Sequence, residues 1–150
     1  MKLVTISETL LKKYAIDDEM LHKSGRPCVL IVRLIYKGKR QDFAVPLRSN
    51  IPAKAPKNQY FSLPPRYQTK PHNHHGLHYI KMFPISRKYL NQYRTNGNSF
   101  ATIIKSILAK NQSVIVSECQ SYLSKCEHGE RPEFSTNIDL LLSVLRDMEQ

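Results

Sequence analysis

The chain has 150 residues, of which 41% are hydrophobic, and carries a formal net charge of +11 at pH 7. This length suits one domain spanning residues 1–150, and the ordinary apolar content argues against a disordered chain. No apolar run approaches the roughly 20 residues needed to cross a bilayer. The N-terminus lacks signal-peptide anatomy, so we expect a cytoplasmic protein without a membrane partner. The three cysteines indicate reduced thiols.

The positive charge is concentrated in one part of the chain. Residues 1–94 carry 18 Lys or Arg against 5 Asp or Glu, and no acidic residue occurs from Phe43 to Ser117. Unmixed charge repels itself, so a surface of one sign indicates a polyanionic partner. Nucleic acid is the partner that basic domains of this kind most often bind. A basic protein without such a partner is the alternative.

Short strands are predicted for the first third. Residues 3–7 form a β-rich run, and Ser7 is placed to cap a short helix. The runs 28–36 and 41–49 flank the turn "KGKR" and predict a β-hairpin. Pro46 lacks an N–H group, so it marks an edge, a bulge or a strand end.

The middle of the chain predicts a long loop. Residues 50–76 contain five prolines and show no period. A loop of this length inside a compact domain is often functional. Residues 76–85 resume as a strand, and Ser86 can cap a short helix over 87–94.

Helices are predicted for the last third. Apolar residues recur at helical spacing between residues 100 and 126, with a kink near Asn111. Thr136 and Asp139 form a capping box for a final helix. The apolar face of that helix comprises Ile138, Leu141, Leu142, Leu145 and Met148. The predicted class is α+β: a small antiparallel sheet with helices packed on it.

Arg48 and Ser49 are the first candidates for chemistry. They lie where a predicted strand ends and the long loop begins, and strand ends hold side chains in fixed directions. Arg48 could bind a phosphate through two parallel N–H bonds, and Ser49 could donate another. The alternative is an exposed strand-end arginine beside a turn serine.

The stretch "KPHNHHGLHY", residues 70–79, holds four of the six histidines. Zinc binding is one interpretation, but four histidines of one loop rarely converge as a tetrahedron. Acid–base chemistry is a second, because imidazole titrates near neutral pH and RNA supplies its own 2′-OH nucleophile. A solvated loop is the third. We take His75, next to the strand start, as the candidate proton carrier.

Basic and aromatic side chains alternate around this loop, a pattern suited to stacking unpaired bases. Some of these aromatics could instead anchor the loop. Arg26, just before the first central strand, is a further phosphate-binding candidate. The candidate RNA-binding residues are Lys54, Lys57, Tyr60, Arg66, Tyr67, Lys70, His72 and Lys81.

Four segments resemble a known family when taken in order. They are "VTIS" near the start, "GRP" before a strand, "FAVPLRSN" after the hairpin turn and "HGLHYIKMFPI" after the loop. Their order and spacing over roughly residues 3–90 resemble the toxins of type III toxin–antitoxin systems. This is the ToxN/AbiQ/TenpN group of endoribonucleases, and its Tenp-type branch looks most similar.

The resemblance implies a strongly bent antiparallel sheet, related to the SH3-like barrel of MazF/Kid-type toxins, with added helices. It implies a metal-independent endoribonuclease without a cofactor that leaves a 2′,3′-cyclic phosphate. It also implies inhibition by a structured RNA of pseudoknot repeats, cellular or phage RNA as substrate, and a hetero-oligomeric protein–RNA assembly. Such systems act in phage defence.

The family's site residues match only in part. Ser49 matches the family serine, whereas Arg48 stands in the place of a threonine. The lysine that follows in the family is absent, and Lys54 is its nearest substitute. Arg26 corresponds approximately to a family lysine, and the histidine loop has no counterpart. Two other functions stay open: a non-catalytic RNA- or DNA-binding module and a zinc-dependent enzyme.

Overall fold

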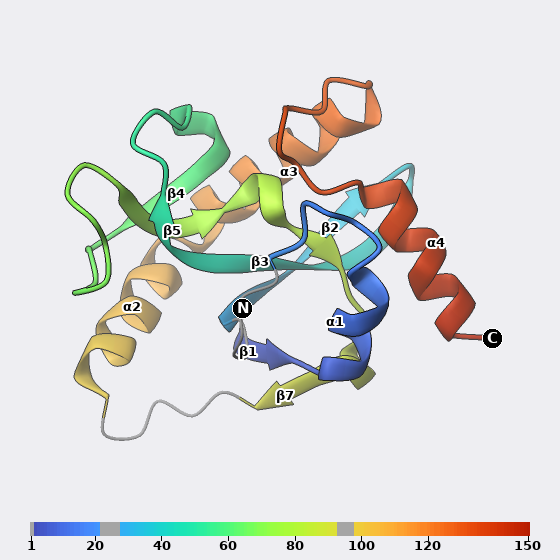
Figure 1. Cartoon of the computed structure of the whole chain (residues 1–150), viewed down its shortest axis with the longest axis horizontal. Helices are drawn as coiled ribbons and strands as arrows, with labels where there is room; N and C mark the ends of the chain where they lie inside the picture. The colour runs from blue at the N-terminus through green and yellow to red at the C-terminus, as the bar shows by residue number, and fades with distance from the viewer. Residues whose placement is uncertain (1, 22–27, 93–97) are drawn as a thin grey trace.

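The structure, a computed structural model, describes residues 2–21, 28–92 and 98–150 (Figure 1). Within these ranges it contains one antiparallel sheet of seven strands and four α-helices. The strands are β1 (Lys2–Ile6), β2 (Cys28–Tyr36), β3 (Lys39–Ile51), β4 (Tyr60–Leu63), β5 (His74–His78), β6 (Phe83–Pro84) and β7 (Leu90–Gln92). The helices are α1 (Glu8–Tyr14), α2 (Ser99–Lys110), α3 (Gln112–Glu127) and α4 (Ile138–Met148).

The long strand β3 joins two parts of the sheet. Residues 39–46 pair with β2, whereas the segment from Leu47 to Ile51 pairs with β5, with a register irregularity after Arg48. Pro46 lies where one ladder gives way to the other, a position where a missing N–H is tolerated. The predicted hairpin of residues 28–49 is confirmed, and its second strand continues to Ile51.

The sheet order is β4-β5-β3-β2-β1-β7, with β6 added against β3. The terminal strands of this path, β4 and β7, do not pair with each other in the described chain, so the sheet is open. The predicted α+β class with an antiparallel sheet is therefore confirmed. The predicted SH3-like barrel is not confirmed, because no ladder closes the sheet.

Two apolar clusters hold the helices on the sheet. One contains Leu30 and Phe43 and includes side chains of α2 and α3. The other contains Ile6 and Ala44 and is covered by α1 and α4, which lie side by side in Figure 1. Alternate residues of a strand point to opposite faces, which explains why neighbouring positions feed different clusters.

Strand β1 pairs only with residues 28–31 of β2, and α3 covers the edge of β2 beyond them. Gln120 accepts from the Ile35 N–H at 2.9 Å and donates to the Ile35 carbonyl at 2.9 Å. Glu127 accepts from the backbone N–H of Lys37 at 2.5 Å. These contacts satisfy backbone groups that would otherwise offer an edge for pairing.

Most helix boundaries follow the sequence. Ser7 accepts a hydrogen bond from the Leu10 N–H and caps α1. The predicted kink near Asn111 is the point where α2 ends and α3 begins. The predicted capping box of α4 is wrong: Asn137 is the cap residue. Thr136 instead donates its hydroxyl to the Met82 carbonyl and so ties the helix start to β6.

Three predicted segments differ from the structure. The loop 50–76 contains β4, a strand of only four residues between prolines, which is too short to show a period. In place of the predicted strand 76–85, β5 ends at His78, a 3₁₀ turn spans residues 79–81, and β6 follows. In place of the predicted helix 87–94, residues 87–92 form a single 3₁₀ turn, which no side chain caps, followed by β7; residues 93 and 94 lie outside the described part of the chain.

The three cysteines form no disulfide. Cys119 is fully buried in the core, and Cys28 and Cys126 are partly buried. Across the described parts of the chain, no helix combines the length and the apolar character that a membrane span requires.

Candidate active site and nucleic-acid interface

The second half of β3 brings Arg48 beside β5. In the ladder Arg48 faces Gly76, and Gly76 faces Ser62 of β4. A Cβ atom added to Gly76 would lie 2.1 Å from the Phe61 carbonyl oxygen, so no other residue fits between these strands. Glycine therefore permits the close approach of β4 and β5 on which this part of the sheet depends.

Arg48 contacts a histidine that was not among the predicted site residues. The distance from Arg48 Nη1 to His78 Nδ1 is 3.2 Å. Burial lowers the pKa of Arg48. Burial, and then the charges of Arg48 and Lys81, lower the pKa of His78 to about 3. No carboxylate forms an ion pair with Arg48 in the described residues, so its charge is available for an anion.

The position of His78 in its strand carries a signal that residue type alone does not. It lies two residues after Gly76 on one strand, so both fall on the same face of the sheet. Gly76 is the register partner of Arg48. Alternation in "HGLH" predicts that His78 shares a face with Gly76, whereas the pairing of Gly76 with Arg48 is a tertiary contact that local pattern does not give.

Ser49 and Asn50 follow on the same strand, and both are half-buried. The Asn50 carboxamide fastens the proline-rich loop to the strand end. Its Oδ1 accepts from the Lys70 N–H at 2.7 Å and from Asn73 Nδ2 at 3.3 Å, and its Nδ2 donates to the Gln68 carbonyl at 3.0 Å. The loop is thus held beside Ser49. Asn50 was also missed, because an asparagine before a loop is an ordinary turn residue.

Several predicted RNA-binding residues are exposed around this strand end. Tyr67, in the fastened loop, is 96% exposed, which is unusual for an aromatic side chain. The exposed basic side chains are Lys54, Lys57, Lys70 and His72. Their RNA contacts stay predictions.

Two other predicted RNA-binding residues already have partners within the protein. The guanidinium of Arg66 lies 5.4 Å from the centre of the Phe100 ring, and its Nε is buried. Tyr60 is 9% exposed, and its ring stacks on His74 at 4.9 Å. One face of each group is taken by the protein, which favours the anchoring role that the sequence analysis left open.

The structure corrects the prediction for Lys81. The sequence predicts an RNA-binding lysine on the strand 76–85, but Lys81 lies in the 3₁₀ turn 79–81 and is 7% exposed. Its ammonium donates to the Phe134 carbonyl at 2.7 Å, to the Glu19 carbonyl at 3.0 Å and to Glu19 Oε1 at 3.1 Å. All three of its hydrogens are used, so none remains for a phosphate. Lys81 ties three chain segments together.

His75 is also not placed for the predicted proton transfer. It is 2% exposed, and its Nδ1 lies 2.7 Å from the Pro64 carbonyl oxygen. Burial lowers the pKa of His75, and the nearby charge of Arg66 acts in the same direction. A proton carrier must reach the atom that it protonates, so the structure favours an anchoring role for this imidazole.

The histidines of the loop occupy separate environments. His74 stacks on Tyr60, His75 bonds to the Pro64 carbonyl, and His78 bonds to Arg48. Three or more His, Cys, Asp or Glu side chains do not gather as a metal group anywhere in the described ranges. The described histidines of this loop therefore do not form a set of zinc ligands. Arg26 lies outside the described residues.

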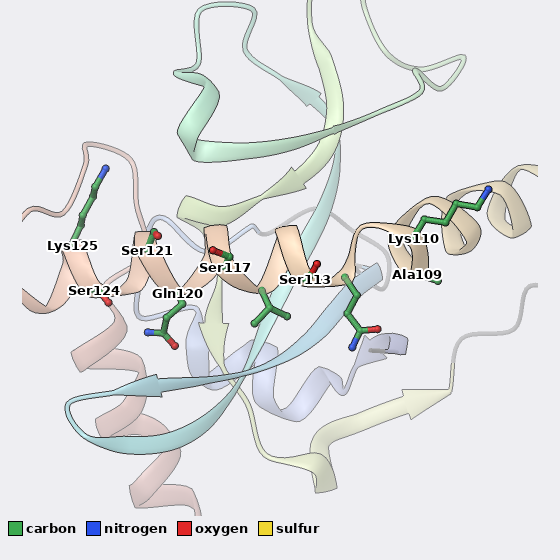
Figure 2. A pocket seen from close by; sticks show the side chains of 10 residues that line it. Ala109, Lys110, Ser113, Ser117, Gln120, Ser121, Ser124 and Lys125 are labelled. Atoms are coloured by element: carbon green, nitrogen blue, oxygen red, sulfur yellow. The ribbon is translucent and has the colours of Figure 1, made fainter.

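A separate hollow runs along α3 (Figure 2). Serine hydroxyls line it, with one lysine near each end. Its polar lining comprises Lys110, Gln112, Ser113, Ser117, Gln120, Ser121, Ser124 and Lys125. It shares no residue with β3, β4 or β5 and contains no acid–base or metal-ligand set, so we assign no chemistry to it.

No family model and no curated protein matches this chain. Among the solved structures that match it, two align over nearly its whole length. One, ToxN, comes from a bacterial antiviral system that a processed non-coding RNA regulates; it is 18% identical, with a TM-score of 0.73 and 98% of each chain covered. The other is AbiQ, a lactococcal anti-phage endoribonuclease of the type III toxin–antitoxin system; it is 14% identical, with a TM-score of 0.74, 99% of this chain covered and 98% of AbiQ.

The chain has the fold of ToxN and AbiQ. The likeness includes the helices as well as the sheet, since it extends over almost every residue of both chains. The family resemblance seen in residues 3–90 thus agrees with a fold shared over the whole length.

Proposed function

We propose that this chain is an endoribonuclease toxin of a type III toxin–antitoxin system. The observation that carries the proposal is the full-length fold likeness to AbiQ and ToxN, one described as an anti-phage endoribonuclease and the other as part of an RNA-regulated antiviral system. A shared fold alone does not define an activity. The chain's own residues add support: no acidic residue occurs from Phe43 to Ser117, and Arg48, at a strand end, has no carboxylate partner among the described residues.

The proposed reaction is transfer of the RNA phosphate to the neighbouring 2′-oxygen. The 2′-oxygen attacks phosphorus and loses its proton, the bond from phosphorus to the 5′-oxygen breaks, and the 5′-oxygen gains a proton. The products are a 2′,3′-cyclic phosphate and a 5′-hydroxyl. Arg48 holds the phosphate and stabilises its added negative charge, and Ser49 donates one hydrogen bond. Arg26 is retained as a second phosphate ligand, and the step requires no metal.

The fastened loop and its neighbours form the proposed RNA surface. Exposed lysines bind phosphates, and Tyr67 offers its ring to an unpaired base. The proposed partners are a structured repeat RNA that inhibits the toxin and the cellular or phage RNA that it cuts. We propose a cytoplasmic hetero-oligomer of protein and RNA, with a single catalytic domain in each chain.

Cleavage of a mixed RNA pool by purified protein in EDTA tests the proposal. We expect discrete cuts with 2′,3′-cyclic phosphate ends. Salt-dependent binding without cuts would instead support the non-catalytic module that the basic charge also allows. Cuts that appear only after zinc is added would contradict metal independence.

A further inference from the structure

We propose that His78 is a positioning residue that orients the Arg48 guanidinium by accepting one of its hydrogen bonds. The inference rests on the proposed function for the role of Arg48, but the contact itself is a property of the fold. His78 does not touch the phosphate in this account; it acts through Arg48.

The contact determines which ring nitrogen carries the hydrogen. Arginine has only donors, so at 3.2 Å the Nδ1 of His78 must be the acceptor. The hydrogen of the neutral ring is then on Nε2. This nitrogen is buried and has no partner in the described residues. An unsatisfied buried donor is a cost to folding, so stability alone does not account for an imidazole at this position.

The backbone explains why the two side chains meet. His78 and Gly76 alternate onto one face of β5, and Gly76 is the register partner of Arg48 on β3. Arg48 therefore reaches His78 diagonally across the ladder, with Nη1 3.2 Å from Nδ1. Tyr60 is the register partner of His78 on the other side, so the imidazole is placed between a strand that carries the cation and one that carries an aromatic ring.

The charged groups around His78 keep it an acceptor. Arg48 faces it from β3, and Lys81 lies close enough in the next turn to influence its titration. Both are cations, and Glu19, the carboxylate of this region, is bonded to Lys81. A protonated imidazole would have no lone pair for Arg48 and would repel it. The neutral ring uses one N–H of the guanidinium and leaves the others for phosphate oxygens.

Two substitutions separate the acceptor from the bulk of the ring. In His78→Asn the side-chain oxygen takes the place of Nδ1, whereas His78→Leu fills the site without an acceptor. We expect His78→Leu to lower kcat about tenfold with little change in KM, and His78→Asn to keep most of the rate. Both variants should unfold at a denaturant concentration close to that of the wild type. Wild-type kcat in His78→Leu would overturn the proposal.

A double-substitution comparison tests whether the effect passes through Arg48. In an Arg48→Ala background, His78→Leu should have no further effect on the rate. An equal loss in both backgrounds would overturn the positioning role, because His78 would then act independently.

The contact can also be tested without any activity. Nuclear magnetic resonance of the Arg48 Nη groups should show slowed exchange in the wild type, retained in His78→Asn and lost in His78→Leu. Unchanged Nη signals in His78→Leu would overturn the inference. If the wild type cuts no RNA, the proposed function fails while this measurement still decides the fate of the Arg48–His78 contact.

Discussion

The two halves of β3 each carry a charged side chain that is at least partly buried, but among the described residues only the one in the first half has ion-pair partners. In the first half, Asp42 is 8% exposed and receives two arginines: Arg33 Nε lies 2.9 Å from its Oδ1, and Arg87 Nε lies 3.4 Å from its Oδ2. In the second half, Arg48 is half-buried, no carboxylate partner occurs for it in the described chain, and its contact is a neutral imidazole.

Paired charges such as Asp42 stabilise the fold, whereas a charge such as Arg48, which has no ion-pair partner in the described ranges, is free to bind a ligand. A buried ion that is paired contributes to structure, whereas an unpaired one costs free energy unless a ligand completes it. Functional sites concentrate such groups. The site is therefore expected at the Arg48 end of β3, although arginines also surround Asp42 in the first half of the strand.

Arg48→Ala should have the largest effect. Removing a donor aimed at developing phosphate charge is expected to lower RNA cleavage about 100- to 1,000-fold and to abolish growth arrest on expression. Arg33→Ala removes the same charge from β2, where Arg33 is paired with Asp42 of β3, and its cleavage rate should stay within about threefold of wild type. Equal losses in the two variants would erase the proposed contrast.

Lys81→Met should show the reverse pattern. The substitution leaves the Glu19 and Phe134 carbonyls and the Glu19 carboxylate without the buried ammonium that donates to them, so we expect a loss of about 3 kcal/mol in the free energy of unfolding. The cleavage rate per folded molecule should not change. Denaturant unfolding and rates at matched folded concentration measure the two effects. A stable variant with weakened RNA binding would return Lys81 to the RNA surface.

His78 should make stability depend on pH. The pKa of His78 is about 3 in the folded chain and near 6.5 in the unfolded chain. Below pH 6.5 the unfolded state therefore binds more protons, and the free energy of unfolding decreases as the pH is lowered. His78→Leu lacks this linkage and should lose about 2 kcal/mol less than wild type between about pH 6 and about pH 4. Urea unfolding at several pH values measures it; identical slopes would mean that His78 has the same pKa in the folded and unfolded chains.

Tyr67→Ala should have the smallest effect. Loss of a stacking ring is expected to weaken RNA binding about tenfold, whereas Tyr67→Phe keeps the ring and the affinity. Because the side chain is exposed, unfolding should be unchanged in both variants. Fluorescence anisotropy with a labelled RNA gives the affinities. A loss in Tyr67→Phe as large as in Tyr67→Ala would point to the hydroxyl rather than to stacking.

The sequence predicted those parts of the site that depend on local pattern. Periodicity located the hairpin that carries Arg48 and Ser49, and helical spacing located α2, α3 and α4. The errors concern tertiary contacts. Lys81 looked like an exposed cation because Glu19 and Phe134 are distant in sequence. His75 looked accessible because β4, too short for a period, was not foreseen beside it.

Cleavage through the 2′-OH of the substrate is the property on which the proposed function depends. The most direct test uses an RNA whose cut site has been mapped, remade with a single 2′-deoxynucleotide on the 5′ side of the cut. Wild-type protein in EDTA should bind both RNAs equally and cut only the unmodified one at that site. Continued cutting of the deoxy substrate at the same bond would contradict cleavage through the 2′-OH.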